Sequence, residues 1–151
     1  MVSPESVFAA ANLLAVAGWL LLALAPRNRR AATVAATVLP VLLSLLYVGL
    51  LAAHWAEARG SFSSLHGVAD LFSNEWVLLA GWVHYLSFDL VVGAWETQDA
   101  VERGVPRWLV IPCLFVTFLF GPAGWLSYRM VRTVHGASRP GLPAAATGVA
   151  S

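Results

Sequence analysis

The sequence predicts an all-α fold, an integral membrane bundle of four transmembrane helices. Hydrophobic residues make up 59% of the 151 residues and charged residues only 11%, which is too apolar for an ordinary soluble domain. Four long apolar runs alternate with short connections, and short connections favour antiparallel neighbours in a bundle. The formal net charge is only +1, so no basic surface indicates a nucleic-acid partner.

The first two apolar runs predict helices over residues 6–25 and 31–55. The first contains 19 uncharged residues and ends at Pro26 and an arginine cluster. Because the start of the chain lacks the positive region of a signal peptide, we expect this helix to be retained. The second contains 23 uncharged residues with Pro40 among them. A proline kinks a helix, and membrane bundles tolerate it where neighbours satisfy the freed carbonyl.

The third run, residues 75–98, is the predicted centre of the bundle. The 19 residues from Val77 to Trp95 are enough to cross a bilayer core as a helix. They nevertheless include His84 and Asp89 near the middle. Ionisable groups at that depth are costly, usually face the bundle interior or a cavity, and often mark function. We therefore expect Asp89 to face the inside of the bundle and not the lipid.

The fourth run predicts a helix over residues 106–132. It holds 21 consecutive uncharged residues and is interrupted by Pro112 and by the pair Gly121 and Pro122. The glycine lets backbones approach and the proline breaks the hydrogen-bond ladder, so the pair could open room for a pocket or simply kink the helix. The longest connection, residues 57–74, carries apolar residues at near-helical spacing and could lie on the membrane surface or cap the bundle.

These elements give one transmembrane domain, residues 1–134, followed by a tail. The tail, residues 135–151, is rich in Ala, Gly, Pro and Ser, and we expect it to be disordered. With four spans, five arginines fall on one side of the membrane and four on the other, which hardly determines the orientation. The compact arginine cluster after the first helix favours placing both termini outside the cytoplasm.

Asp89 is the first candidate catalytic residue. As a functional group it would be an acid or base in a low-dielectric pocket, where desolvation favours the protonated form and keeps a proton available. As a structural group it would be a carboxyl hydrogen-bonded to Tyr85, to a tryptophan or to a freed backbone carbonyl. The position of Asp89 deep in a span favours the functional interpretation.

His84 is the second candidate, either as a proton acceptor or as a hydrogen-bonded packing residue. A helix turns about 100° per residue, so side chains five residues apart point roughly 140° away from each other. His84 and Asp89 therefore do not form a ready-made pair. Glu75 and Glu96, at opposite ends of the same predicted helix, are expected to lie at the membrane interface, with the alternative that one of them rims a pocket.

Aromatic and helix-breaking residues complete the predicted site. They form a set of substrate-binding positions whose side chains could contact an elongated apolar ligand. For each ring taken singly, core packing is the simpler explanation. The predicted set is Trp82, Tyr85, Phe88, Trp95, Gly121 and Pro122. We expect an elongated apolar cavity, open to the bilayer, bordered by the third helix and the break at Gly121 and Pro122.

No motif in the sequence indicates a cofactor or a metal. Histidines and carboxylates do not occur at H-x-x-H or E-x-x-H spacing, and no Gly-rich phosphate loop, nucleophile elbow or CxxC pair is present. We therefore expect neither a cofactor nor a metal site. Cys113 is the single cysteine, so no disulfide can form within the chain.

Three stretches resemble one known family. They are AGWVHYLSFDLVVGAW (80–95), GVPRWLVIPCLFVTFLFGPAGWLSY (104–128) and GSFSSL (60–65). They are similar to the abscisic-acid-deficient-four-like family of small four-span membrane proteins, whose plant members are chloroplast proteins required to make neoxanthin from violaxanthin. The resemblance covers nearly the whole chain, but its motifs are not established catalytic signatures. The start of the sequence does not resemble a transit peptide, so we expect a bacterial protein of the inner membrane.

The resemblance implies a carotenoid or isoprenoid isomerase that needs no redox cofactor. In that chemistry an epoxide opens, a polyene proton leaves, and an allene and a hydroxyl form, which takes an acid and a base. Asp89 suits the acid and neutral His84 the base. The alternative is a non-enzymatic protein that binds a carotenoid or lipid, or supports biosynthetic enzymes. In either case the expected partners are an apolar isoprenoid and the lipid bilayer, and the chain could form homo-oligomers.

Overall fold

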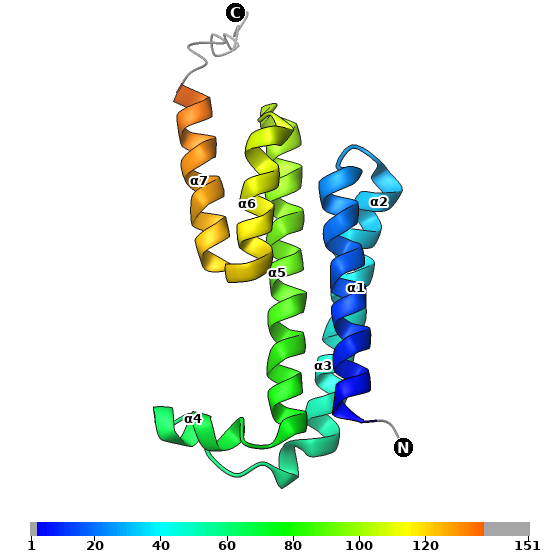
Figure 1. Ribbon diagram of the computed structural model, residues 1–151, viewed down its shortest axis with the longest axis vertical. Helices are drawn as coiled ribbons and strands as arrows, with labels where there is room; N and C mark the ends of the chain where they lie inside the picture. Colours follow the sequence, from blue (N-terminus) through cyan, green and yellow to red (C-terminus); the bar gives the residue numbers. More distant parts are fainter. Residues whose placement is uncertain (1–2, 138–151) are drawn as a thin grey trace, which may run out of the picture.

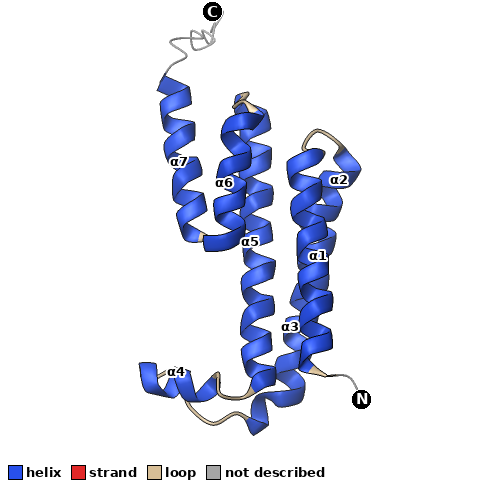
Figure 2. Ribbon diagram, viewed as in Figure 1, coloured by secondary structure: helices blue, strands red, loops and turns tan. Residues whose placement is uncertain are grey.

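The computed structural model describes residues 3–137, which form helices and connecting loops only (Figure 2). The elements in chain order are α1 (Pro4–Leu24), α2 (Arg29–Thr33), a π-helical segment (Val34–Val38), α3 (Leu39–His54), a 3-10 turn (Trp55–Glu57), α4 (Leu65–Leu71), α5 (Glu75–Arg103), α6 (Arg107–Phe120) and α7 (Pro122–Ala137). Residues 138–151, most of the predicted tail, lie outside the described part of the chain.

Three helices are long and apolar enough to cross a membrane: α1, the continuous helical run from Arg29 to Glu57, and α5. These are the first three predicted spans. The π-helical turn comes immediately before Leu39 and Pro40. A proline cannot donate to the preceding turn and its ring crowds the carbonyl four residues earlier, so a wider turn at this point relieves that conflict.

Side-chain caps fix where α1 and α5 begin. Ser3 and Ser6 form a reciprocal capping box at the start of α1, with Pro4 in the first turn. The Asn74 side chain accepts hydrogen bonds from the backbone N–H groups of Trp76 and Val77. These contacts satisfy backbone donors that would otherwise lack partners at a helix start.

Helix α5 is the centre of the bundle, as predicted, and two clusters of buried apolar side chains lie along it (Figure 1). The cluster around its N-terminal half joins only α1, α3 and α5, and its members are Ala11, Ala15, Leu43, Leu50, Leu79, Ala80, Val83 and Leu86. The cluster around its C-terminal half also includes α6 and α7, for example Val110, Leu114 and Tyr128. The last two helices therefore cover only one half of α5.

The prediction of a single fourth span over residues 106–132 was wrong. The chain reverses at Gly121, and α7 runs back alongside α6 as a hairpin (Figure 1). Gly121 has φ +33° and ψ −91°, a conformation that side-chain-bearing residues rarely adopt, and Pro122 starts the returning helix. With 14 residues, α6 is about 21 Å long, which is shorter than the roughly 30 Å hydrocarbon core.

The connection before α5, in which apolar residues have near-helical spacing, contains the short helix α4. Helix α4 lies crosswise at the end of the bundle that also holds the N-terminus (Figure 1). Ser64 caps its start by accepting from the Gly67 N–H at 3.0 Å. The α6–α7 hairpin lies toward the opposite end, beside the C-terminal half of α5.

Candidate functional site

Three buried carboxyl groups lie along α5 in the part of the helix that the hairpin covers. Asp89, Glu96 and Asp99 expose 8%, 0% and 8% of their surface. Spacings of seven and three residues place them near one face of the helix. Three buried acidic groups in one apolar helix are costly, so each needs a partner or a function.

Asp89 is the central residue of the 29-residue α5 and faces the interior, as predicted. Its carboxyl lies against the hairpin turn: a Cβ added to Gly121 would come within 2.6 Å of Asp89 Oδ1. Oδ2 is buried and has no hydrogen-bond partner within residues 3–137. The turn and the carboxyl therefore meet about halfway along the helix that spans the membrane.

Tyr85 and Gly121 lie next to the Asp89 carboxyl, whereas the exposed Pro122 only starts the returning helix. The Tyr85 hydroxyl is close to the Asp89 carboxyl and donates to the Phe118 carbonyl at 3.2 Å. That carbonyl lies in the last turn of α6, where backbone carbonyl groups have no hydrogen-bond donor within the helix. Pro122 is exposed and begins α7.

Glu96 is buried inside the bundle, which contradicts the expectation of a solvated residue at the end of a span. Its carboxylate is fully buried, with Thr117 Oγ1 at 3.0 Å and 3.1 Å from its two oxygens. Thr117 Oγ1 also lies 3.0 Å from the Cys113 carbonyl. A hydroxyl can donate only one hydrogen bond. If Thr117 donates to the backbone carbonyl of Cys113, then a hydrogen bond between Thr117 and Glu96 requires a protonated Glu96 that donates to the hydroxyl. The seven-residue spacing from Asp89 was the signal in the sequence.

Asp99 joins α5 to α7 and was absent from the predicted site. It accepts from Arg103 Nε at 2.8 Å and from the Tyr128 hydroxyl at 2.7 Å, and Arg132 Nη1 lies 3.4 Å away. Tyr128 is fully buried and packs edge-on against Trp95. The i,i+4 spacing of Asp99 and Arg103 was visible in the sequence, but the contacts to α7 depend on the reversal.

This network makes a stability prediction. Tyr128→Phe removes one hydroxyl and leaves Asp99 Oδ2 without that donor, and an unsatisfied buried acceptor costs about 1–3 kcal/mol. We expect a lower free energy of unfolding in denaturant titrations of the purified protein. Tyr47→Phe is the matched control, because it also removes a tyrosine hydroxyl but keeps the ring contact with His84. Equal stability of the two variants would contradict the role of the network.

His84 lies on another side of α5 and does not meet Asp89. Its ring contacts Tyr47 of α3 edge-on at 5.3 Å and stacks on Phe88 at 4.7 Å. It lines a cavity of ≈ 730 Å³ between α3, α5 and the α4 region. The structure therefore does not bring the predicted acid and base together, in agreement with their angular separation on an ideal helix.

That cavity is large, apolar and bordered by the third span, as expected, but the break at Gly121 and Pro122 does not line it. Its walls are aliphatic and aromatic, and Tyr47, Trp55 and His84 are the lining side chains that carry a polar atom. The lining consists of Tyr47, Val48, Leu51, Ala52, Trp55, Phe62, Leu71, Phe72, Val77, Gly81 and His84. Its volume is within the 300–1,000 Å³ of typical ligand sites.

The other predicted aromatic residues have separate surroundings. Trp82 donates from Nε1 to the Asn12 side chain of α1 at 3.2 Å, and its ring lies 5.4 Å from that of Tyr85. Trp95 contacts Tyr128 of α7. Both indole rings are partly exposed, so each can contact a lipid or a ligand at the edge of the bundle.

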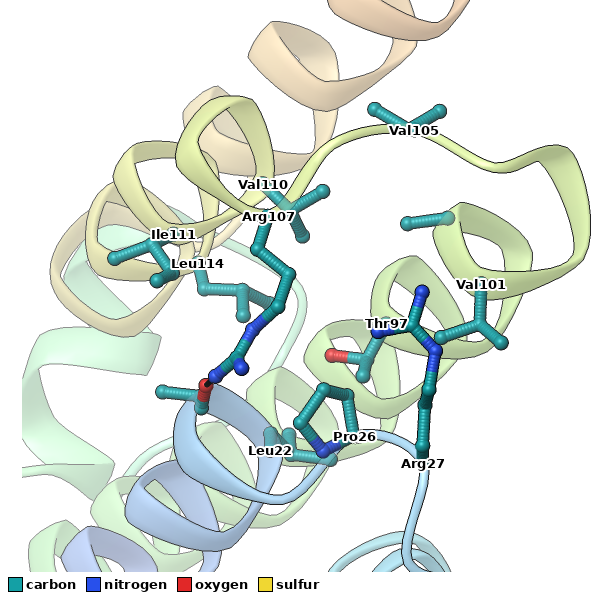
Figure 3. A pocket seen from close by; sticks show the side chains of 12 residues that line it. Leu22, Pro26, Arg27, Thr97, Val101, Val105, Arg107, Val110, Ile111 and Leu114 are labelled. Carbon is teal, nitrogen blue, oxygen red and sulfur yellow. Dashed lines mark hydrogen bonds between the residues drawn. The ribbon is translucent and has the colours of Figure 1, made fainter.

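The far end of the hairpin is tied to α1 by Arg107. Its Nη2 donates to the Ala23 carbonyl at 2.6 Å, over a small cavity of ≈ 20 Å³ whose lining includes Leu22, Pro26, Thr97 and Leu114 (Figure 3). A cavity of that size holds about one water molecule. The contact satisfies a carbonyl at the C-terminal end of α1 and fixes the start of α6.

Residues 3–137 contain no group of three or more His, Cys, Asp or Glu side chains arranged to hold a metal ion. The three carboxyl groups of α5 are instead distributed along the helix. Each has its own surroundings in the hairpin: Gly121 beside Asp89, Thr117 beside Glu96, and Tyr128 beside Asp99.

One protein family matches most of the chain. A family model described as ABA DEFICIENT 4-like matches residues 6–128. The chain belongs to the ABA4-like family. This confirms the resemblance found in the sequence, and the match includes α5 and the hairpin turn. The chloroplastic protein ABA DEFICIENT 4 of Arabidopsis thaliana is 30% identical over 140 residues, covering 86% of this chain and 62% of the plant protein. No solved structure matches the chain.

Proposed function

We propose that this ABA4-like chain is a membrane-embedded isomerase of a carotenoid or another apolar isoprenoid, with the Asp89 carboxyl as its proton-transfer group. One observation carries the proposal: Asp89 is buried halfway along α5, beside the hairpin turn, with Oδ2 lacking a partner within residues 3–137. An unpaired carboxylate in hydrocarbon is strongly disfavoured, so we expect the group to be protonated until a ligand arrives.

A single carboxyl can supply both proton steps of an epoxide-to-allene rearrangement. The acid gives its proton to the epoxide oxygen, and the bond from that oxygen to the polyene-side carbon breaks. The carboxylate then removes a proton from the neighbouring polyene carbon, whose C–H electrons form the second double bond to the carbon that lost oxygen. Protons and electrons balance, because the product is an isomer of the substrate.

In this scheme the Asp89 carboxylate, and not His84, acts as the base, because the geometry gives no support for a His84–Asp89 pair. His84 keeps a proposed binding role in the apolar cavity beside α3, and Phe88, which stacks on the His84 ring, is a proposed contact next to that cavity. Tyr85 would orient the Asp89 carboxyl from one turn earlier on the same helix. Trp82 and Trp95 are proposed contacts for the parts of a long ligand that extend along the outside of α5.

The second candidate function is carotenoid or lipid binding without chemistry. The ≈ 730 Å³ apolar cavity favours it, because binding there involves no residue of the Asp89 site. A protein of this kind would hold a ligand or support other enzymes of isoprenoid biosynthesis.

One experiment separates the two functions. The protein is purified from a membrane that contains carotenoids, and the co-purified pigments and lipids are identified. It is then incubated with polyene epoxides, and the products are compared by chromatography with those from a protein-free control. An isomer that forms only with protein supports the isomerase, whereas a ligand that binds and is recovered unchanged supports the binding protein.

A further inference from the structure

The α6–α7 hairpin places the last arginines of the described chain at a different end of the bundle than a single fourth span would. A single fourth span would have carried Arg129 and Arg132 to the opposite membrane face from Arg103. Because the chain reverses at Gly121, Arg132 instead lies 3.4 Å from Asp99, near the C-terminal end of α5. Arg139 lies outside the described residues.

Seven of the eight arginines within residues 3–137 therefore belong to one end of the bundle (Figure 1). They lie in the α1–α2 connection and the start of α2, at the junction of α5 and α6, and on the returning arm of α7. The set is Arg27, Arg29, Arg30, Arg103, Arg107, Arg129 and Arg132, and it is called the arginine end below. All but the half-buried Arg132 are exposed.

The opposite end, which holds the N-terminus and α4, is acidic. It carries Glu5, Glu57, Asp70 and Glu75, with Arg59 as the one arginine of the described residues there. At the arginine end, Glu102 is the one exposed carboxylate among the described residues, and Asp99 is buried and bonded to Arg103. The bundle therefore has a strong charge asymmetry along its long axis.

We propose that the arginine end lies in the cytoplasmic leaflet, where its exposed guanidinium groups bind the phosphates of anionic lipid headgroups. Arginine is enriched on the cytoplasmic side of membrane proteins, and that leaflet carries the negative surface potential. A guanidinium matches a phosphate with two parallel hydrogen bonds. A shallow hollow lined by Arg29, Arg30, Thr33 and Val34 brings two such groups together.

This orientation places the N-terminus and α4 on the non-cytoplasmic side and the end of α7 on the cytoplasmic side. It differs from the expectation of two termini outside the cytoplasm, because an odd number of spans separates the termini. It is independent of the proposed isomerase, since no residue of the arginine end belongs to the Asp89 site.

Cysteine labelling tests the orientation in the full-length chain, expressed in a bacterial inner membrane. Cys113→Ser removes the single cysteine and serves as the unlabelled background. Ser63→Cys, before α4, and Glu102→Cys, in the last turn of α5, are then made separately at exposed positions. We expect a membrane-impermeant maleimide to label Ser63→Cys in intact spheroplasts, and Glu102→Cys only after permeabilisation. The reverse pattern, or labelling of both in intact spheroplasts, would overturn the orientation.

Lipid-dependent stability tests the binding of headgroups. Phosphatidylglycerol added to the detergent-purified protein should raise Tm by about 4 °C relative to phosphatidylcholine, and the Arg29→Gln, Arg30→Gln double variant should lose most of that rise. Arg59→Gln, at the acidic end, is the matched control and should keep the full rise. Inorganic phosphate should leave Tm unchanged. Equal Tm values in the two lipids, or an equal loss in the Arg59→Gln control, would overturn the headgroup site.

Discussion

Asp89→Asn should lower the rate of substrate isomerisation about 100-fold or more while leaving the fold intact. The amide keeps the size and the polarity of the carboxyl, but it has no acidic proton to transfer. Loss of a general acid typically costs a factor of 10²–10⁴ in rate. The measurement is product formation from the polyene epoxide that the wild-type protein converts, with ligand binding followed in parallel.

Two further variants tell this role from a structural one. If Asp89 were only structural, Asp89→Asn would work nearly normally and Asp89→Leu would change mainly the Tm. His84→Gln should reduce the rate much less than Asp89→Asn, because His84 faces Tyr47 and Phe88 and not the Asp89 carboxyl. A loss in His84→Gln equal to that in Asp89→Asn would restore His84 as the base. Wild-type rates in both variants would rule out acid–base chemistry at this site.

The first three spans could be predicted because each is encoded locally. Apolar runs of sufficient length, with a Ser cap at the start of α1 and an Asn cap at the start of α5, are signals that lie within each segment itself. The interior position of Asp89 also followed from sequence, because the cost of a lipid-facing carboxyl is large and general.

The hairpin could not be predicted because a kinked helix and a reversed helix share one sequence pattern. Gly121 and Pro122 break a helix, but the direction of the next helix depends on what it packs against. Here Gly124 fits directly against Thr117, and Tyr128 reaches Asp99, so the returning arm is held by contacts distant in sequence. Hydropathy treats residues 106–132 as one apolar segment and carries no information about these contacts.

The buried carboxyl of Glu96 was missed for the same reason. At the end of a presumed 24-residue helix, a glutamate is expected at the interface, where its charge is solvated. The helix instead continues to Arg103, and the hairpin covers Glu96 with Thr117. Once α6 and α7 are known to lie beside the C-terminal half of α5, the seven-residue spacing from Asp89 to Glu96 becomes informative.

Gly124→Ala should clearly destabilise the protein, although it adds only one methyl group. A Cβ at Gly124 would overlap Thr117 N, Oγ1 and Cα. Two of these three atoms are backbone atoms of α6, so no side-chain rotation can relieve the overlap and the two arms must separate. Overpacking of this kind costs about 1–3 kcal/mol, occasionally more.

The consequences of separating the arms can be traced to named contacts. Thr117 would move away from Glu96, and Tyr128 away from Asp99, which would leave two buried carboxyl groups with fewer partners. We therefore expect a lower Tm, together with faster hydrogen exchange in α6 and α7 and little change in α1 and α3. This pattern separates a local loss of the hairpin from global unfolding.

Gly49→Ala is the matched control for this substitution. Gly49 is exposed in α3, and a Cβ there would meet no atom within 4 Å. Alanine should therefore be neutral or stabilising there by about 0.5–1 kcal/mol, through the lower conformational entropy of the unfolded chain and its better helix propensity. If Gly124→Ala and Gly49→Ala unfold at the same temperature, α6 and α7 do not pack as a tight hairpin. Continuous protection from exchange through Gly121 in the wild-type protein would likewise contradict the reversal and favour a single span.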